Sequence, residues 1–144
     1  AGPGGQARSC RARRGLRRLK KRYVIGTLSN GNVGLLVNMA KNAGLPWDVV
    51  FSAESFHHYK PDPETYLGAA DLLGCAPGEV MLVAAHKDDL FAAKACGLRT
   101  AFVRRPLEYG PAKRADLKAE RAFDFNVDAF SQLADRLCGR SGAR

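Results

Sequence analysis

Lys60 stands in the stretch of the sequence best suited to chemistry, a loop that leads into a helix. Pro61 disfavours helical backbone at Lys60, so the lysine is expected on an extended or turning backbone. Asp62 is a favourable N-cap, and Pro63 suits the first helical position, where its missing N–H costs nothing. A lysine held just before a helix N-terminus can hold an anion, but a solvated loop lysine would fit the same residues.

Two further polar clusters follow apolar runs: Ser29 and Asn30 after residues 23–28, and His86 to Asp89 after residues 79–84. A hydroxyl, an amide and an ammonium group together suit an oxyanion such as a carboxylate or a phosphate. A carboxylate of the third cluster would keep Lys60 charged and oriented. It could instead bind Mg²⁺ together with a substrate phosphate.

The elements that must position these clusters alternate between strands and helices. Short apolar runs predict strands at 23–28, 49–52, 79–84, 99–103 and 123–127. Helical spacing and capping residues predict helices at 33–43, 63–73, 90–96 and 129–138, with Asn32, Asp62 and Asp128 as N-caps and Gly44 just past the first of these helices. Apolar strands that alternate with helices predict an α/β fold with a mostly parallel sheet, in which sites form at the carboxyl ends of the strands.

The positive charge of the chain is concentrated at its N-terminus. The net charge is +9, and residues 1–22 hold nine of the 23 lysines and arginines and no acid. The remaining residues carry 14 basic and 14 acidic side chains. We therefore treat residues 1–22 as a basic N-terminal segment that is partly disordered or non-native and ends in a helix over 16–22, residues 23–138 as the core, and 139–144 as a tail. Such an arm could bind nucleic acid, but we expect none.

Composition limits the other classes of protein. The chain has 144 residues, which suits one domain, and 46% of them are apolar. It contains no apolar run long enough to span a membrane and no signal peptide. The four scattered cysteines make no metal spacing, so we interpret them as free thiols in a reducing compartment. We expect a cytoplasmic protein with no membrane partner.

Three motifs resemble the haloacid dehalogenase superfamily, and within it the type II 2-haloacid dehalogenases. They read LSNGN, then HYKPDPETY, then VMLVAAHKDDLFAAKACGLRTAFVRRP. The resemblance covers residues 16–137, and the order and spacing of the three motifs make it specific. It implies a Rossmann-like three-layer core and an aspartate nucleophile that displaces halide from C2 to form an ester, which water then hydrolyses.

The resemblance also implies roles for individual residues. Ser29 would bind the substrate carboxylate, and Asn30 would lie near the departing halide. Lys60 would neutralise the nucleophile and the developing charge. Tyr66 matches the tyrosine found six residues after that lysine, and Asp89 matches the acid that positions the lysine or the hydrolytic water.

Two features depart from the family pattern. The opening segment with its nucleophile is missing, since no aspartate precedes Asp48, and the first strand and the helical cap are missing with it. The chain thus resembles the C-terminal part of the enzyme. His86 stands where dehalogenases have an asparagine, so a different handling of the hydrolytic water is expected here. Asp88 is expected to support Asp89 without touching the substrate, or to cap a helix.

Three alternatives follow from these observations. The first is a cofactor-free hydrolase of small 2-haloacids, a possible homodimer. The second is a phosphatase in which Asp88 and Asp89 bind Mg²⁺. The third is a non-catalytic, truncated or nucleic-acid-binding protein. Without a first strand in the sheet centre, the chain by itself is predicted to be marginally stable or oligomeric.

Overall fold

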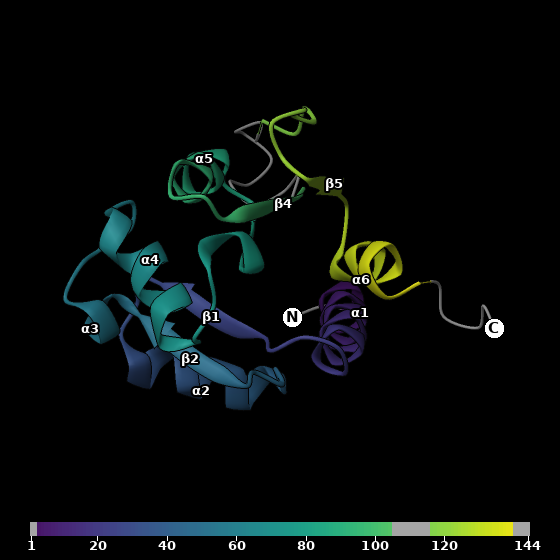
Figure 1. The fold of residues 1–144 in the computed structure, drawn as a ribbon. Coiled ribbons are helices and arrows are strands. Elements are labelled where there is room, and N and C mark those ends of the chain that lie inside the picture. The colour runs from purple at the N-terminus through teal and green to yellow at the C-terminus, as the bar shows by residue number, and fades with distance from the viewer. Residues whose placement is uncertain (1–2, 105–115, 140–144) are drawn as a thin grey trace.

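The computed structural model describes residues 3–104 and 116–139, and its helices and strands alternate along the chain (Figure 1). Helices and strands follow in the order α1 (Pro3–Lys20), β1 (Gly26–Ser29), α2 (Val33–Ala43), β2 (Val49–Ser52), α3 (Ala53–Phe56), α4 (Pro63–Leu72), β3 (Met81–Ala84), α5 (Lys87–Ala95), β4 (Arg99–Val103), β5 (Phe125–Val127) and α6 (Phe130–Cys138), with a short 3₁₀ helix at Pro77–Glu79. The expected α/β fold is confirmed.

Every strand pairing is parallel, but the strands form two sheets instead of one. β1 pairs with β2, and β3, β4 and β5 form a three-stranded sheet in that order. Within the described residues β1 and β3 each have a single neighbour, so each keeps one edge without a strand partner. This is the place where the sequence predicts a missing central strand.

The core lies on the two faces of the larger sheet. β4 alternates its side chains between them. Phe102 belongs to a buried cluster with Tyr66, Leu82 and Leu90 under α4 and α5. Ala101 and Val103 belong to a second cluster on the other face, which Leu19, Val127, Leu133 and Ala134 complete. Helices therefore cover both faces of this sheet, as its continuous apolar strands predict.

α1 and α6 pack closely against each other (Figure 1). A Cβ at Gly15 would stand 2.7 Å from the backbone of Phe130 and Ser131, so only glycine permits this approach. Leu16 and Leu19 are buried, and Arg18 forms a 2.8 Å ion pair with Asp135. The C-terminal turns of α1 thus belong to the core and are not a free arm.

Several details differ from the sequence-based expectations. The helix expected over 16–22 already begins at Pro3 and ends at Lys20. α6 starts at Phe130 with Ala129 at the N-cap, because the Asp128 carboxylate pairs with Arg104 at 2.7 Å. Asp62 occupies the N-cap of α4, but its side chain makes no capping hydrogen bond. Asn32 caps α2 by accepting from Leu35, and Gly44 ends that helix at a φ of 65°, both as expected.

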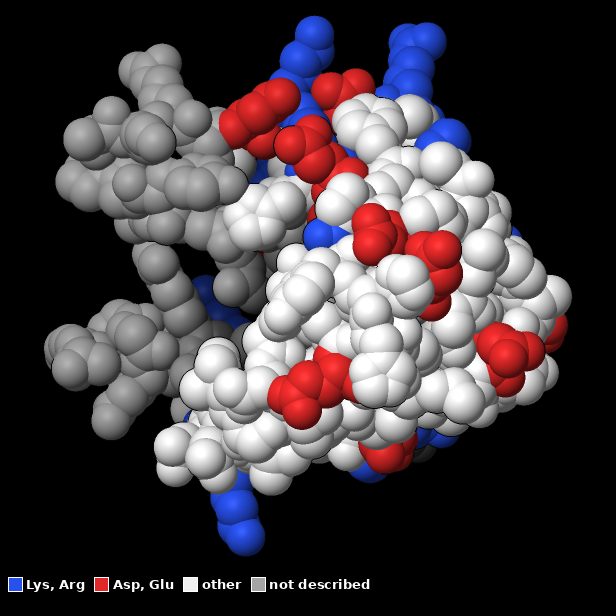
Figure 2. All heavy atoms as spheres, turned by 90° about the vertical axis from the view of Figure 1, so that its left-hand side faces the viewer, with Lys and Arg blue, Asp and Glu red and all other residues white. Residues whose placement is uncertain are grey.

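The face that carries α3 and α4 is largely uncharged. Figure 2 shows acidic groups in the middle of this face and long basic side chains projecting at its margins.

None of the helices in the described part of the chain is both long and apolar enough to cross a membrane. The four cysteines are free. Most of the charged segment expected at 104–122 and most of the expected tail, at residues 105–115 and 140–144, lie outside the described residues.

Candidate active site

Asp89 is the centre of a hydrogen-bonded cluster between the two sheets. Its Oδ2 accepts from the Lys60 ammonium at 2.5 Å, and its Oδ1 accepts from the Tyr66 hydroxyl at 2.6 Å. The side chains of Lys60 and Asp89 are 19% and 15% exposed. The contact is a short, charge-assisted hydrogen bond that is largely shielded from solvent. The structure thus brings together three of the residues that the sequence singled out.

Three separate elements deliver these groups. Lys60 comes from the loop between α3 and α4, Tyr66 from the end of the first turn of α4, and Asp89 from the first turn of α5. α4 starts at Pro63, which is preorganised for a first helical position. α5 starts beyond the carboxyl end of β3, so Asp89 lies at the sheet edge where sites form in parallel α/β proteins.

Tyr66 is fully buried, and this burial sets its protonation state. Burial raises the pKa of its hydroxyl, and the hydrogen bond to the Asp89 carboxylate raises it further. The phenol therefore stays neutral and donates to Asp89. Asp89 is left with one cationic and one neutral donor, which fix its orientation toward Lys60.

Asn30 acts on the backbone of Lys60. Its Oδ1 accepts from the Lys60 N–H at 2.7 Å, and its Nδ2 donates to the Lys60 carbonyl at 3.2 Å. This two-point contact fixes the loop residue that carries the ammonium group. The structure shows the amide holding the Lys60 backbone, and the place near the halide that the resemblance implies for Asn30 stays a prediction.

Ser29 ends β1 and is partly buried. Its Oγ accepts the Gly31 N–H at 3.1 Å, which shapes the turn after the strand. Because the oxygen acts as the acceptor in this contact, the hydroxyl proton remains able to donate to another group. The expected role of Ser29 requires such a donor.

A cavity of about 220 Å³ lies beside the cluster. Lys60, His86 and Asp89 supply its polar wall, and the apolar part of the lining consists of Val83, Ala84, Ala85, Val103 and Phe130. A small molecule with one charged end and a short apolar body would suit this lining. Sequence reasoning missed Val103 and Phe130 at this cavity, because spacing along one helix or strand does not show which cavity a side chain borders.

Asp88 and Asp89 differ in their surroundings although they are neighbours. Asp88 is exposed on the first turn of α5, whereas both oxygens of Asp89 are engaged by Lys60 and Tyr66. Mg²⁺ prefers several oxygen ligands around one point. The described residues place one carboxylate at the cavity, and Lys60 and Tyr66 already engage both of its oxygens, so a magnesium ion there would need further oxygen ligands from outside the described residues.

Lys87 anchors a distant segment beside the site, which sequence reasoning missed. Its ammonium contacts Asp116 at 2.9 Å and Glu120 at 3.0 Å, and it lies 5.4 Å from the centre of the Phe102 ring. Burial lowers the pKa of Lys87, but the hydrogen bonds to the two carboxylates outweigh this effect and raise it overall. The position of Lys87 inside the third motif, between His86 and Asp88, was the available signal.

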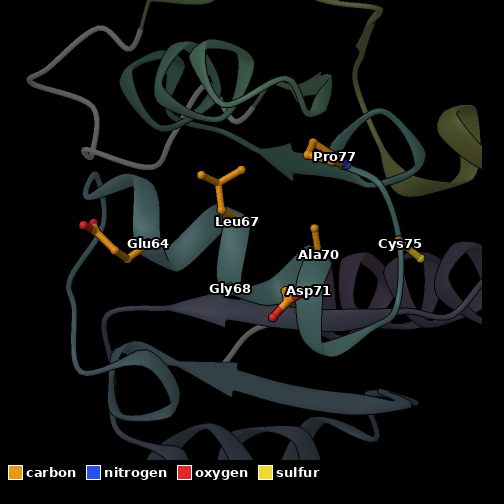
Figure 3. Close-up of a pocket in the computed structure, with 7 residues that line it drawn as sticks. All are labelled: Glu64, Leu67, Gly68, Ala70, Asp71, Cys75 and Pro77. Carbon is orange, nitrogen blue, oxygen red and sulfur yellow. The ribbon is translucent and has the colours of Figure 1, made fainter.

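A larger groove of about 490 Å³ lies along α4 and the segment that follows it, and neither Lys60 nor Asp89 lines it (Figure 3). It is lined by Glu64, Leu67, Gly68, Ala70, Asp71, Cys75 and Pro77. The groove lacks a lysine or arginine to balance its acids, and it is open to solvent. We therefore place the candidate site at the smaller cavity, where the charged cluster is.

Comparison with known proteins follows the same motifs. Residues 11–97 match the model of a family described as "Hydrolase: haloacid dehalogenase-like hydrolase". The chain belongs to this family. The parallel sheets and the Lys60 loop indicate the same haloacid dehalogenase-like family.

Relatives of this haloacid dehalogenase-like chain include two kinds of hydrolase. The (S)-2-haloacid dehalogenase 4A of Burkholderia cepacia is 38% identical over 92 residues, which cover 60% of this chain and 40% of the relative. A defluorinating L-2-haloacid dehalogenase of known structure is 50% identical, with a TM-score of 0.84, and the match covers 88% of this chain and 51% of that one. The pyrophosphatase PpaX of Bacillus cereus is 34% identical over 87 residues, which cover 60% of this chain and 38% of the relative.

The chain spans about half the length of these relatives or less. The family and the fold are therefore shown for this chain. The activity of a whole protein is a separate matter, because the relatives contain sequence that has no counterpart among these 144 residues.

Proposed function

We propose that this chain forms the C-terminal part of a hydrolase that removes halide from small 2-haloacids through an aspartyl ester. The observation that carries the proposal is the Lys60–Asp89–Tyr66 cluster, set beside a small, partly apolar cavity at the carboxyl end of β3. Relatives that are named 2-haloacid dehalogenases support it. The nucleophile would come from a part of the protein outside these 144 residues.

The proposed first step is a displacement at C2. A carboxylate oxygen of the nucleophile attacks C2, the carbon–halogen bond breaks, and the halide leaves with the electron pair. Lys60 would balance the charge of the attacking carboxylate, and Asp89 would keep the ammonium group aimed at it. In the second step water attacks the ester carbonyl, which releases the 2-hydroxyacid and restores the carboxylate.

His86 would act in the hydrolysis of the ester, and Ser29 would act in the binding of the substrate. His86 lines the cavity, where its imidazole could take the proton from the attacking water. Ser29 would donate its hydroxyl proton to the carboxylate of the substrate. Asn30 would act through Lys60, since its amide contacts the backbone of that residue. Asp88, exposed beside Asp89, would contribute through its charge.

The unpaired edges of β1 and β3 suggest where the nucleophile belongs. β1 lies between β2 and the larger sheet, and Leu28 of β1 packs against the cluster that contains Leu82 of β3 (Figure 1). A strand that paired with both edges would end beside Lys60. We propose that such a strand, supplied by the missing part of the protein, carries the attacking aspartate.

The dehalogenase proposal is tested by halide release from 2-chloropropionate in the absence of metal. We would compare this chain alone with a version extended upstream through the missing strand. Only the extended version should release chloride. Lys60→Gln in that version should lower kcat by about 10²–10³-fold, because it removes a charge that acts in the transition state. Lys41→Gln, which changes an exposed lysine of α2, is the matched control and should leave kcat unchanged.

A phosphatase is the second candidate, and the similarity to the pyrophosphatase PpaX supports it. It would release phosphate from a phosphomonoester or pyrophosphate only with Mg²⁺, and it would not release chloride. Asp88→Asn and Asp89→Asn would then each lower the affinity for Mg²⁺, so that more Mg²⁺ is needed for half-maximal activity. Both candidate functions place the nucleophile outside these 144 residues. Chloride release by the unextended chain would contradict that placement.

A nucleic-acid-binding chain is less well supported. Arg18 and Lys20 of α1 are engaged with Asp135 and Asp48, so part of the basic segment is neutralised by the fold. Binding through the exposed residues Arg11, Arg14 and Arg17 would weaken steeply with salt. Changing these three residues to glutamine tests this alternative without removing Leu16 and Leu19 from the core.

A further inference from the structure

A second cluster of potential ligands lies on the loop that carries Lys60 and on the first turn of α4, and none of its residues lines the cavity beside Asp89. Among the described residues, His58, Asp62 and Glu64 form one group whose ligand atoms all lie within 4.8 Å of one another. The His58 Nδ1 is 3.3 Å from Asp62 Oδ2 and 3.8 Å from Glu64 Oε2. We propose that these three residues bind a divalent transition-metal ion.

The spacing of the three ligand atoms suits such an ion. Metal–ligand distances near 2.1 Å in a tetrahedron place neighbouring ligand atoms about 3.4 Å apart. The two distances from His58 are already close to this value, so small side-chain rotations would complete three of the four positions. The three side chains are 42%, 54% and 57% exposed, which leaves room for water as the fourth ligand and for entry from solvent.

The chemistry of the donors selects the class of metal. One imidazole nitrogen and two carboxylates suit Zn²⁺, Co²⁺ or Ni²⁺, whereas Mg²⁺ and Ca²⁺ prefer oxygen ligands alone. Two carboxylates also offset the unfavourable field that a cation meets at the N-terminus of α4.

The side chains of Asp62 and Glu64 are directed toward this point. The Asp62 carboxylate makes no capping hydrogen bond to α4 and instead faces His58. Glu64 projects from the first turn of α4 toward the loop that precedes the helix, away from Leu67 (Figure 3). Neither acid is paired with a lysine or arginine in the contacts of the described residues.

A metal at this point would brace the loop. His58 lies two residues before Lys60, and Asp62 and Glu64 lie after it, so one ion would join both sides of the lysine. Asn30 already holds the Lys60 backbone from β1. The ion would act as a structural clip on the loop, separate from the Lys60–Asp89 pair.

The test is a titration of the full chain with Co²⁺, followed by visible absorption and isothermal calorimetry. One equivalent should bind, with the d–d bands of nitrogen and oxygen ligation and without the near-ultraviolet charge-transfer band that thiolate ligation produces. His58→Ala and Glu64→Gln should each weaken binding at least about tenfold, since even partners of metal ligands have effects of this size. All three ligands are at least partly exposed, so these variants should keep the unfolding midpoint of the parent.

Two matched variants control for unspecific effects. His57→Asn removes the neighbouring imidazole and tolerates the φ of 57° at that position. Asp71→Asn removes another exposed acid of α4. Both should bind Co²⁺ like the parent. Hydrogen exchange gives a second measurement: amides of residues 57–62 should exchange more slowly with Co²⁺ in the parent and in His57→Asn, but not in His58→Ala.

The proposal is overturned if His58→Ala and Glu64→Gln bind Co²⁺ as tightly as the parent. It is also overturned if the bound ion shows thiolate charge transfer, which would place it at a cysteine such as Cys75. Equal loss in His57→Asn and His58→Ala would indicate unspecific imidazole binding and would likewise exclude the site.

Discussion

The larger sheet and the smaller sheet differ in how completely they are buried. β4 is buried at four of its five residues and has a core cluster on each face. In the smaller sheet only Ser52 is buried, and α2, which covers it, has no buried residue. Leu35, Val37 and Met39 of α2 are 51%, 44% and 53% exposed. The apolar pattern of α2 therefore finds too little partner surface in this chain.

This contrast explains how the candidate site is held together. The two sheets share no strand pairing among the described residues, so other contacts must join them. Tyr66 is one such contact, because α4 brings it from the smaller half into the core beneath β3 and β4. Lys60 and Asp89 form another. The cluster proposed for catalysis is thus also a tie between a well-packed half and a poorly packed one.

The largest expected effect separates the two halves directly. Phe102→Ala removes a fully buried ring from β4 and should lower the free energy of unfolding by about 3–5 kcal/mol. Leu35→Ala on α2 should change it by no more than about 0.5 kcal/mol, because that side chain is half exposed. Urea unfolding followed by circular dichroism measures both. A similar loss in the two variants would show that α2 is covered in solution.

Gly15 tests the helix pair beside the larger sheet. Gly15→Ala should destabilise by about 1–3 kcal/mol, because its Cβ would press on the backbone of Phe130 and Ser131, which cannot move like a side chain. Gly78→Ala is the matched control, since a Cβ there meets no atom within 4 Å. If both variants unfold at the parent's midpoint, α1 and α6 are further apart than described.

Tyr66 should make the stability of the folded chain sensitive to high pH. Its pKa in the folded chain is raised above its ordinary value of 10.0, so above that pH the unfolded chain loses a proton that the folded chain keeps. The free energy of unfolding should then fall by up to about 1.4 kcal/mol per pH unit. Tyr66→Phe should flatten this slope. An unchanged slope in the variant would assign the alkaline loss to other groups.

Asn30 should give the smallest effect. Asn30→Ala removes two hydrogen bonds to the Lys60 backbone and should cost about 1 kcal/mol, since both bonds lie near solvent. Asn38→Ala, an exposed asparagine of α2, serves as the control. In the extended protein Asn30→Ala should lower kcat more than Asn38→Ala does. Equal activity of the two variants would show that Lys60 needs no support from Asn30.

Much of the local structure was predictable because short-range interactions decide it. The strands at 49–52 and 99–103 have the predicted bounds, and the ends of α2 follow from Asn32 and Gly44. α6 was mispredicted at its start, because Arg104 competes for the Asp128 carboxylate from across the fold. The helical backbone before residue 16 was also missed, since sparse apolar residues give no periodic signal there.

By itself, the sequence determined most of the order of strands and helices and their parallel arrangement, and the resemblance of its motifs to a known family singled out Lys60, Tyr66 and Asp89. These depend on residue type and spacing, which a chain carries without folding. Only the tertiary structure decided that Asp89 binds both Lys60 and Tyr66, that Asn30 holds the Lys60 backbone, and that the strands divide into two sheets. Each of these outcomes depends on which distant groups compete for one donor, one acceptor or one strand edge, and that competition takes place only in three dimensions.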